Sequence, residues 1–129
     1  MYKEFIISII IIISIFTLDK VTTQYLEESV DIISENLQSL KEISENENIN
    51  NEEVEKKINY IYEEWKKRYE KLAYYIEHDE LEKVETKLVG IKSNIETNEN
   101  EQEIEKIDEA IFLLEHIKNK DSLNLKNIF

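Results

Sequence analysis

The sequence contains no proline and a single glycine, Gly90. Tight β-hairpin turns and glycine-rich phosphate-binding loops both depend on glycine at fixed positions, so neither is expected. An α-helix needs neither residue in its interior and is destabilised by both. The sequence therefore predicts a mostly helical chain, and its 129 residues are enough for one small domain.

A long apolar run lies near the amino terminus, where residues 5–18 read FIISIIIIISIFTL without a charged side chain. As a helix this run covers roughly 21 Å, which is less than the ~30 Å hydrocarbon layer of a membrane. Lys3 and Lys20 can extend their stems outward and lengthen the span, and isoleucine lies on every side of the helix. We therefore expect a transmembrane anchor over residues 1–20.

Two other interpretations of the apolar run remain open. A cleaved signal peptide has a core of similar length, but the small residues that signal peptidase needs are missing, and Val21 with Thr23 is a weak substitute. A buried central helix of a bundle is the second alternative. If the run is an anchor, Lys3 and the free amino group against Glu4 leave its leading flank slightly positive. The positive-inside rule then predicts a single-pass protein of the cell membrane with an extracytoplasmic carboxy-terminal domain.

Four later segments are amphipathic, with apolar residues spaced three and four apart as in helices that pack on other helices. We predict these helices at about 21–44, 51–77, 80–96 and 101–118. The predicted fold is all-α, with an N-terminal transmembrane helix followed by an antiparallel up-down four-helix bundle. The tail, residues 120–129, is expected to be extended and to dock on the bundle through its apolar side chains, with disorder as the alternative.

Polar residues mark the expected links between the helices. Three pairs have the spacing of a capping box, namely Asn50 with Glu53, Asp79 with Glu82, and Asn100 with Glu103. The middle pair favours a tight turn near His78, although one continuous helix through this point is the alternative. Gly90 costs about 1 kcal/mol relative to alanine inside a helix, so its presence suggests a close approach of two helices.

Charge and cysteine content exclude several classes of function. Acidic residues outnumber basic ones by 29 to 16, which gives a net charge of −13 and makes nucleic acid and anionic lipid headgroups unfavourable partners. The absence of cysteine excludes disulfides, thiolate zinc sites and thiol catalysis. The serines are scattered and neither histidine stands in the context of a nucleophile, so we expect no enzyme and no cofactor.

The two histidines are weak candidates for metal ligands. The glutamate that precedes histidine by three residues in di-iron bundles is absent at both positions. In an antiparallel bundle the two histidines should nevertheless lie toward the same end, and imidazole with carboxylate suits zinc or copper. The candidate set is His78, His116, Asp79 and Glu115. The plainer interpretation, which we favour, places His78 in a turn and His116 on the surface.

Tyr62, Trp65 and Tyr69 are three and four residues apart, so they share one side of the helix predicted at 51–77. Tyrosine and tryptophan are common at protein interfaces because a large apolar ring carries a polar tip. This aromatic face is therefore the candidate interaction surface, for a protein partner or for a second copy of the chain. The alternative is that the same spacing belongs to the hydrophobic core.

Several segments together resemble a known family. They are the isoleucine-rich amino-terminal span, the tryptophan-bearing helix, the stretch EHDELEKVETKL at 77–88, and the ending LLEHIKNKDSLNLKNIF at 113–129. The chain resembles, over nearly its whole length, a family of short single-span helical proteins of unknown function from Gram-positive spore-forming anaerobes. The resemblance implies an N-anchored helical protein at the cell envelope, and it brings no activity, cofactor or catalytic residue.

The expected function is therefore that of a structural or protein-interaction module at the cell envelope, tethered to the membrane by its first helix. The alternative is an extracytoplasmic ligand- or metal-binding sensor bundle that works with a separate subunit.

Overall fold

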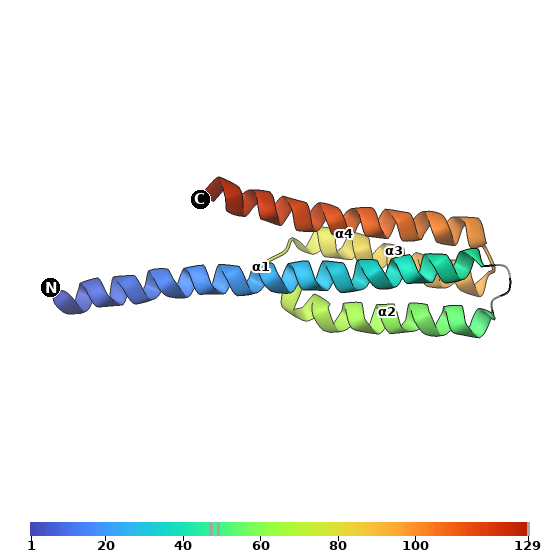
Figure 1. The fold of residues 1–129 in the computed structure, drawn as a ribbon, viewed down its shortest axis with the longest axis horizontal. Helices are drawn as coiled ribbons and strands as arrows, with labels where there is room; N and C mark the ends of the chain where they lie inside the picture. The colour runs from blue at the N-terminus through green and yellow to red at the C-terminus, as the bar shows by residue number, and fades with distance from the viewer. Residues whose placement is uncertain (47, 49, 129) are drawn as a thin grey trace.

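The computed structural model describes residues 1–46, 48 and 50–128, and these residues form four helices. Helix α1 spans Tyr2–Glu45, α2 spans Asn51–Leu72, α3 spans His78–Glu96 and α4 spans Asn100–Ile128. The helices lie side by side and alternate in direction, so both ends of the chain lie at the same end of the molecule (Figure 1). The predicted all-helical, antiparallel bundle is confirmed.

The bundle is a ring of four helices around one core. Within the described residues, α1 and α3 each pack against both α2 and α4. The buried side chains are those of the predicted apolar seams, among them Leu26, Ile33, Leu37, Ile58, Ile61, Trp65, Leu88, Ile91, Ile107 and Leu114. Each fully buried side chain of this size stabilises the fold by roughly 1.5–3 kcal/mol, so the seams account for the association of the helices.

Helix α1 has two parts with different surroundings. It is 44 residues long, or about 66 Å. Every residue from Met1 to Leu18 is exposed, and the first buried residue is Leu26. The leading part of α1 therefore projects beyond the other helices (Figure 1), and none of its apolar window is covered by the bundle. This exposure contradicts the interpretation of the run as a buried central helix.

The link between α2 and α3 falls earlier than the sequence indicates. Helix α2 ends at Leu72, not at residue 77, and α3 begins at His78, not at residue 80. The N-cap position of α3 is Glu77, so Asp79 lies inside the helix. The apolar stripe misleads here because Ile76 is buried although it lies in the turn, where its N–H donates to the carbonyl of Leu72. The turn also rules out one continuous helix through this point.

Helix α4 continues to Ile128, which corrects the expectation of an extended tail from residue 120. The sequence after Asn100 contains no glycine or proline that would stop a helix. Lys118 and Lys120 also tie this part of α4 to the bundle, through Asp31 at 2.9 Å and Glu80 at 3.0 Å. The docking predicted for the tail concerns side chains that lie outside the described ones, namely Leu123, Leu125, Ile128 and Phe129.

The close approach predicted at Gly90 is made by a side chain. A Cβ at Gly90 would lie 2.9 Å from Cδ of Lys106, which reaches across from α4. The Lys106 ammonium donates to Oδ1 of Asn94, which is buried on α3, at 3.3 Å. Gly90 thus leaves room for a lysine stem that carries its charge to a buried amide.

Candidate functional site

The most extensive exposed feature is the apolar surface of α1. Its large side chains from Phe5 to Leu18 are each at least 40% exposed. The three polar side chains of this run, Ser8, Ser14 and Thr17, donate to carbonyls four residues earlier at 2.8–2.9 Å. No hydroxyl in the run therefore needs water. By length and composition the helix can cross a membrane, and a signal sequence at this position has the same properties.

The candidate interaction residues on α2 divide into core and rim. Trp65 is 1% exposed and belongs to the core, so it is not available to a partner. Tyr69 packs edge-on against Trp65, with ring centroids 6.2 Å apart, and is half-buried. Tyr62 is also half-buried, and the ammonium of Lys66 lies 4.8 Å from its ring centroid. The two tyrosines therefore form a rim above the buried tryptophan.

His78 bridges α2 and the first turns of α3. Its Nδ1 lies 3.0 Å from the hydroxyl of Tyr69, and its Nε2 lies 2.8 Å from a carboxylate oxygen of Glu82. Since a carboxylate only accepts, Nε2 donates to Glu82, and in the tautomer with its hydrogen on Nε2 the ring accepts a hydrogen bond from the Tyr69 hydroxyl at Nδ1. Burial, together with the negative charges of Glu82 and Glu85, raises the pKa of Tyr69. Tyr69 therefore stays a neutral donor, and the contact fastens the turn between the two helices.

The four candidate metal ligands do not form a metal-binding group. His116 is exposed on α4 and stacks on Phe112, with ring centroids 6.5 Å apart. Asp79 and Glu115 are exposed on α3 and α4. Across the part of the chain that the structure describes, no group of three or more histidine, aspartate or glutamate side chains is placed to hold a metal ion. His78 is engaged with Tyr69 and Glu82 instead.

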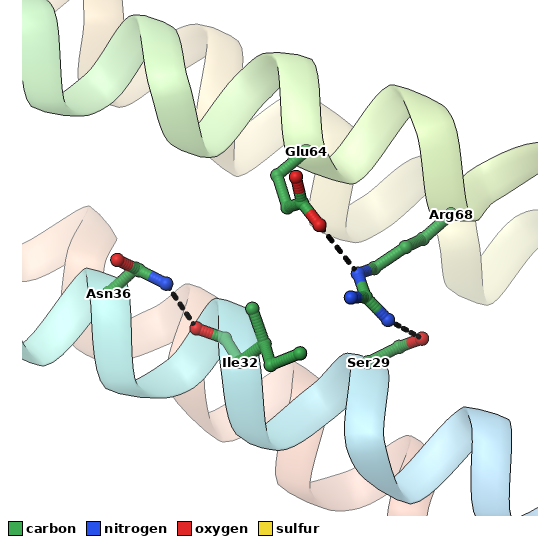
Figure 2. A network of polar contacts seen from close by, with 5 residues as sticks. All are labelled: Ser29, Ile32, Asn36, Glu64 and Arg68. Atoms are coloured by element: carbon green, nitrogen blue, oxygen red, sulfur yellow. Dashed lines mark hydrogen bonds and ion pairs between the residues drawn. The ribbon is translucent and has the colours of Figure 1, made fainter.

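A polar seam joins α1 to α2 and was not foreseen. Arg68, the one arginine of the sequence, extends from α2 to α1, where it donates to Ser29 at 3.0 Å (Figure 2). Its Nε also donates to Glu64 at 3.1 Å. Farther along the same interface, Lys57 donates to Asn36 at 2.8 Å, and Asn36 donates to the carbonyl of Ile32 at 2.7 Å.

The sequence does contain a signal for this seam. Ser29 follows the core residue Leu26 by three positions, and Asn36 follows the core residue Ile33 by three. Side chains three apart on a helix lie on the same face, so both polar residues had to point toward a neighbouring helix. A buried polar side chain usually has a partner, which a long cation on the facing helix supplies here.

A polar cavity of about 240 Å³ lies at the end of the bundle remote from both termini. Ends of all four helices contribute to its lining, with Ile43, Ser44, Asn51, Val54, Ile95, Asn98 and Glu103 among the lining residues. Asn98 has a left-handed backbone with φ of 60°, a conformation that asparagine tolerates better than most residues. The Asn51 side chain donates to that of Asn98 at 3.4 Å.

Glu103 is the buried carboxyl of this cavity. Its side chain turns toward α1 and accepts a short hydrogen bond from the Ser44 hydroxyl, and the residue is only 5% exposed. Burial raises the pKa of Glu103, and the bond from Ser44 lowers it in part. The sequence placed Glu103 in a capping pair with Asn100, but Asn100 is already the first residue of α4. The Glu103 N–H bonds to the carbonyl of Glu99 and leaves the side chain free to turn inward.

These features define a class of protein, an acidic helical bundle whose first helix extends outward as an exposed apolar segment. The chain belongs to the family described as a domain of unknown function (DUF4363), whose model matches residues 20–128. No curated protein and no solved structure matches the chain. The match begins just after the apolar run and includes the end of α4, so the family domain coincides with the bundle and its last helix.

Proposed function

We propose that the chain is a single-span membrane protein whose bundle serves as a structural or protein-interaction module on the extracytoplasmic side of the cell envelope. The observation that carries the proposal is the leading part of α1, which is apolar on all sides, uncovered by the bundle and satisfied in its own hydrogen bonds. Exposed apolar surface of this extent is rare on a water-soluble monomer and is stable in lipid. No catalytic activity forms part of the proposal.

The orientation follows from the charges that flank the apolar run. Lys3 and the amino terminus lie before it, and the acidic bundle follows it. Protease added to intact cells should therefore degrade the bundle, and the full-length chain should stay in the membrane pellet after extraction at alkaline pH. Recovery of the unprocessed chain in the soluble fraction would contradict the anchor, and protection of the bundle in intact cells would contradict the orientation.

The half-buried rim of Tyr62 and Tyr69 and the exposed ring of Phe112, which is 71% exposed, support contact with another protein. A photoreactive side chain in place of Tyr62 should crosslink in native membranes to one reproducible partner or to a second copy of the chain. The matched control replaces the exposed Glu55, which lies on the same helix. Equal and diffuse crosslinking from both positions would argue against this surface.

The cavity at Glu103 favours a second candidate function, a ligand-binding bundle that works with a separate subunit. Its lining combines a buried carboxyl, a hydroxyl and several amides with the apolar side chains of Ile43, Val54 and Ile95, which suits a small polar molecule with a cationic group. A panel of small amines should then include one that raises the melting temperature of the wild type but not of Glu103→Gln. A panel without such a compound would leave the cavity with a structural role.

A further inference from the structure

We infer that the end of the bundle formed by the α2–α3 turn and the last turns of α4 lies in the lipid headgroup layer of the membrane that α1 crosses. The inference rests on the proposed function, because it requires α1 to be inserted. It adds a second contact with lipid, made by the family domain itself. Because α1 rises by about 1.5 Å per residue, contacts with named residues of α1 give the distances of α2 and α4 from the apolar run.

Contacts with Tyr25 show how far along α1 the α2–α3 turn lies. Arg68 and Lys71, near the end of α2, lie 5.7 Å and 5.4 Å from the ring centroid of Tyr25. The turn follows directly at residues 73–77. Leu18, the last residue of the apolar run, precedes Tyr25 by about 10 Å along α1. Figure 1 shows the turn at the point where α1 leaves the bundle.

The ion pair between Lys118 and Asp31 fixes the level of α4 in the same way. Helix α4 runs antiparallel to α1 and continues from Lys118 to Ile128, which is about 15 Å farther toward the membrane. Its end is therefore level with Val21 of α1, next to the apolar run. Figure 1 agrees, because α4 reaches farther along α1 than either α2 or α3 does.

The shortness of the apolar run then determines the depth of the bundle. The hydrocarbon layer is ~30 Å thick and each headgroup layer adds roughly 5–8 Å, whereas the run from Phe5 to Leu18 covers roughly 21 Å. A helix that is short for the bilayer draws its flanking residues inward. Both the end of α4 and the turn, at most about 10 Å above Leu18, consequently fall within or at the edge of the headgroups.

The chemistry of this end suits a headgroup layer. Tyr74, in the turn, is 89% exposed, and tyrosine is enriched where lipid meets water. Lys120 pairs with Glu80 at 3.0 Å and with Glu77 at 3.8 Å, so the acidic residues of this end are partly neutralised. At the opposite end, the first turn of α4 carries Glu101 and Glu103. A zwitterionic lipid surface is therefore the matching partner.

The absence of cysteine makes a direct test practical, because single cysteines can be labelled in the full-length chain. We would place a fluorophore at Ala73→Cys in the turn, at Glu101→Cys at the opposite end, and at Ile10→Cys in the apolar run. Each variant is reconstituted in phosphatidylcholine vesicles that contain lipid with a nitroxide on either the headgroup or the acyl chain. Ala73 and Glu101 are both exposed, so neither label displaces a core side chain.

The label at Ala73 should lose most of its fluorescence to the headgroup nitroxide, and the label at Glu101 should lose little. Quenching of Ile10 by the acyl-chain nitroxide, with Ala73 quenched no more than Glu101, would overturn the headgroup contact and leave the anchor intact. Absence of quenching at Ile10 would overturn the anchor and the contact together. In the Ala73→Cys background, Tyr74→Glu should reduce the quenching at residue 73 and Tyr60→Glu should not. Equal effects of the two changes would show that Tyr74 makes no specific contribution to the headgroup contact.

Discussion

Glu103 illustrates, at the scale of one residue, how the bundle tolerates an unfavourable group. Burial raises the pKa of its carboxyl in the folded chain, and the hydroxyl of Ser44 compensates in part. The folded state then binds a proton at Glu103 more readily than the unfolded state does, so protonation of Glu103 contributes to the free energy of unfolding at low pH. This contribution is lost as the pH rises through the raised pKa.

We therefore expect Glu103→Gln, which keeps an acceptor for Ser44 and removes the charge, to raise the free energy of unfolding at pH 7. The gain should shrink toward the ordinary carboxyl pKa of about 4.3. Urea unfolding of the full chain in detergent, followed by circular dichroism at several pH values, measures it. Glu101→Gln is the control, because Glu101 is exposed in the same helical turn. Equal gains from both variants would show that only net charge matters.

Gly90 and Lys106 form a second pair whose effects are coupled. Alanine at residue 90 gains about 1 kcal/mol in helix stability over glycine. In the wild type, its methyl group would displace the Lys106 stem and weaken the bond to Asn94, which is worth about 0.5–1.5 kcal/mol. Gly90→Ala should therefore change the free energy of unfolding by less than about 1 kcal/mol in the wild type.

In a Lys106→Ala background, the same change should stabilise the fold by the full amount of about 1 kcal/mol. A double-mutant cycle by urea unfolding measures the difference between the two backgrounds. If Gly90→Ala had the same effect in both, the contact with Lys106 would not be the reason for the glycine.

At the scale of the helices, the three-and-four spacing of apolar residues correctly predicted which side chains are buried. Seam residues such as Leu26, Ile58 and Leu88 are buried, and Asn50 caps α2 by accepting from the Glu52 N–H at 3.2 Å. Helix ends were predicted less well because an apolar residue can be buried from a turn, as Ile76 is. The tail became helical because no residue in it stops a helix and ion pairs that are remote in sequence hold it.

The candidate sites were less predictable than the helices, because they depend on which helix faces which. Spacing placed Trp65 correctly beside Tyr62 and Tyr69, but the side of α2 that faces the core follows from its packing against α1 and α3. The bond between Ser44 and Glu103 joins residues far apart in the sequence, and no local pattern indicates it. Ser29 and Arg68 were in principle detectable from the seam spacing of α1.

The continuity of α1 can be tested with a proline in its connecting stretch. Thr23→Pro removes the hydrogen bond to the carbonyl of Asp19 and clashes with it, at a local cost of about 3 kcal/mol. Residue 23 precedes the first buried residue, Leu26, so the unfolding midpoint of the bundle should stay unchanged. In the wild type, spin labels at Ile10→Cys and Glu42→Cys should lie about 48 Å apart with a narrow distribution.

The proline should broaden that distribution, and Thr23→Ala should not. Pulsed electron paramagnetic resonance in the same detergent measures both. A narrow distance retained in the Thr23→Pro variant would show that α1 does not bend at this position.

At the scale of the whole molecule, the core and the apolar run are independent in packing. No residue before Leu26 is buried, and the family match begins at residue 20. The buried core therefore lies wholly within the part of the chain that the family model matches, and the exposed apolar run lies before it.

Deletion of residues 1–20 should accordingly give a folded, water-soluble bundle. Its free energy of unfolding should lie within about 0.5 kcal/mol of that of the full chain, as for changes remote from the core. Circular dichroism, sedimentation and urea unfolding of both chains in the same detergent provide the comparison. A truncated chain that aggregates or unfolds at clearly lower urea would show that the run supports the core.

Helix α1 is continuous from Tyr2 to Glu45, so no flexible link separates the apolar run from the bundle. A rotation of the run about its own axis therefore rotates Ser29, Asn36 and Ser44 by the same angle. The first two of these face α2, and Ser44 bonds to Glu103 of α4. Torque applied inside a bilayer would thus be delivered directly to the polar contacts that set how α1 seats against its two neighbours.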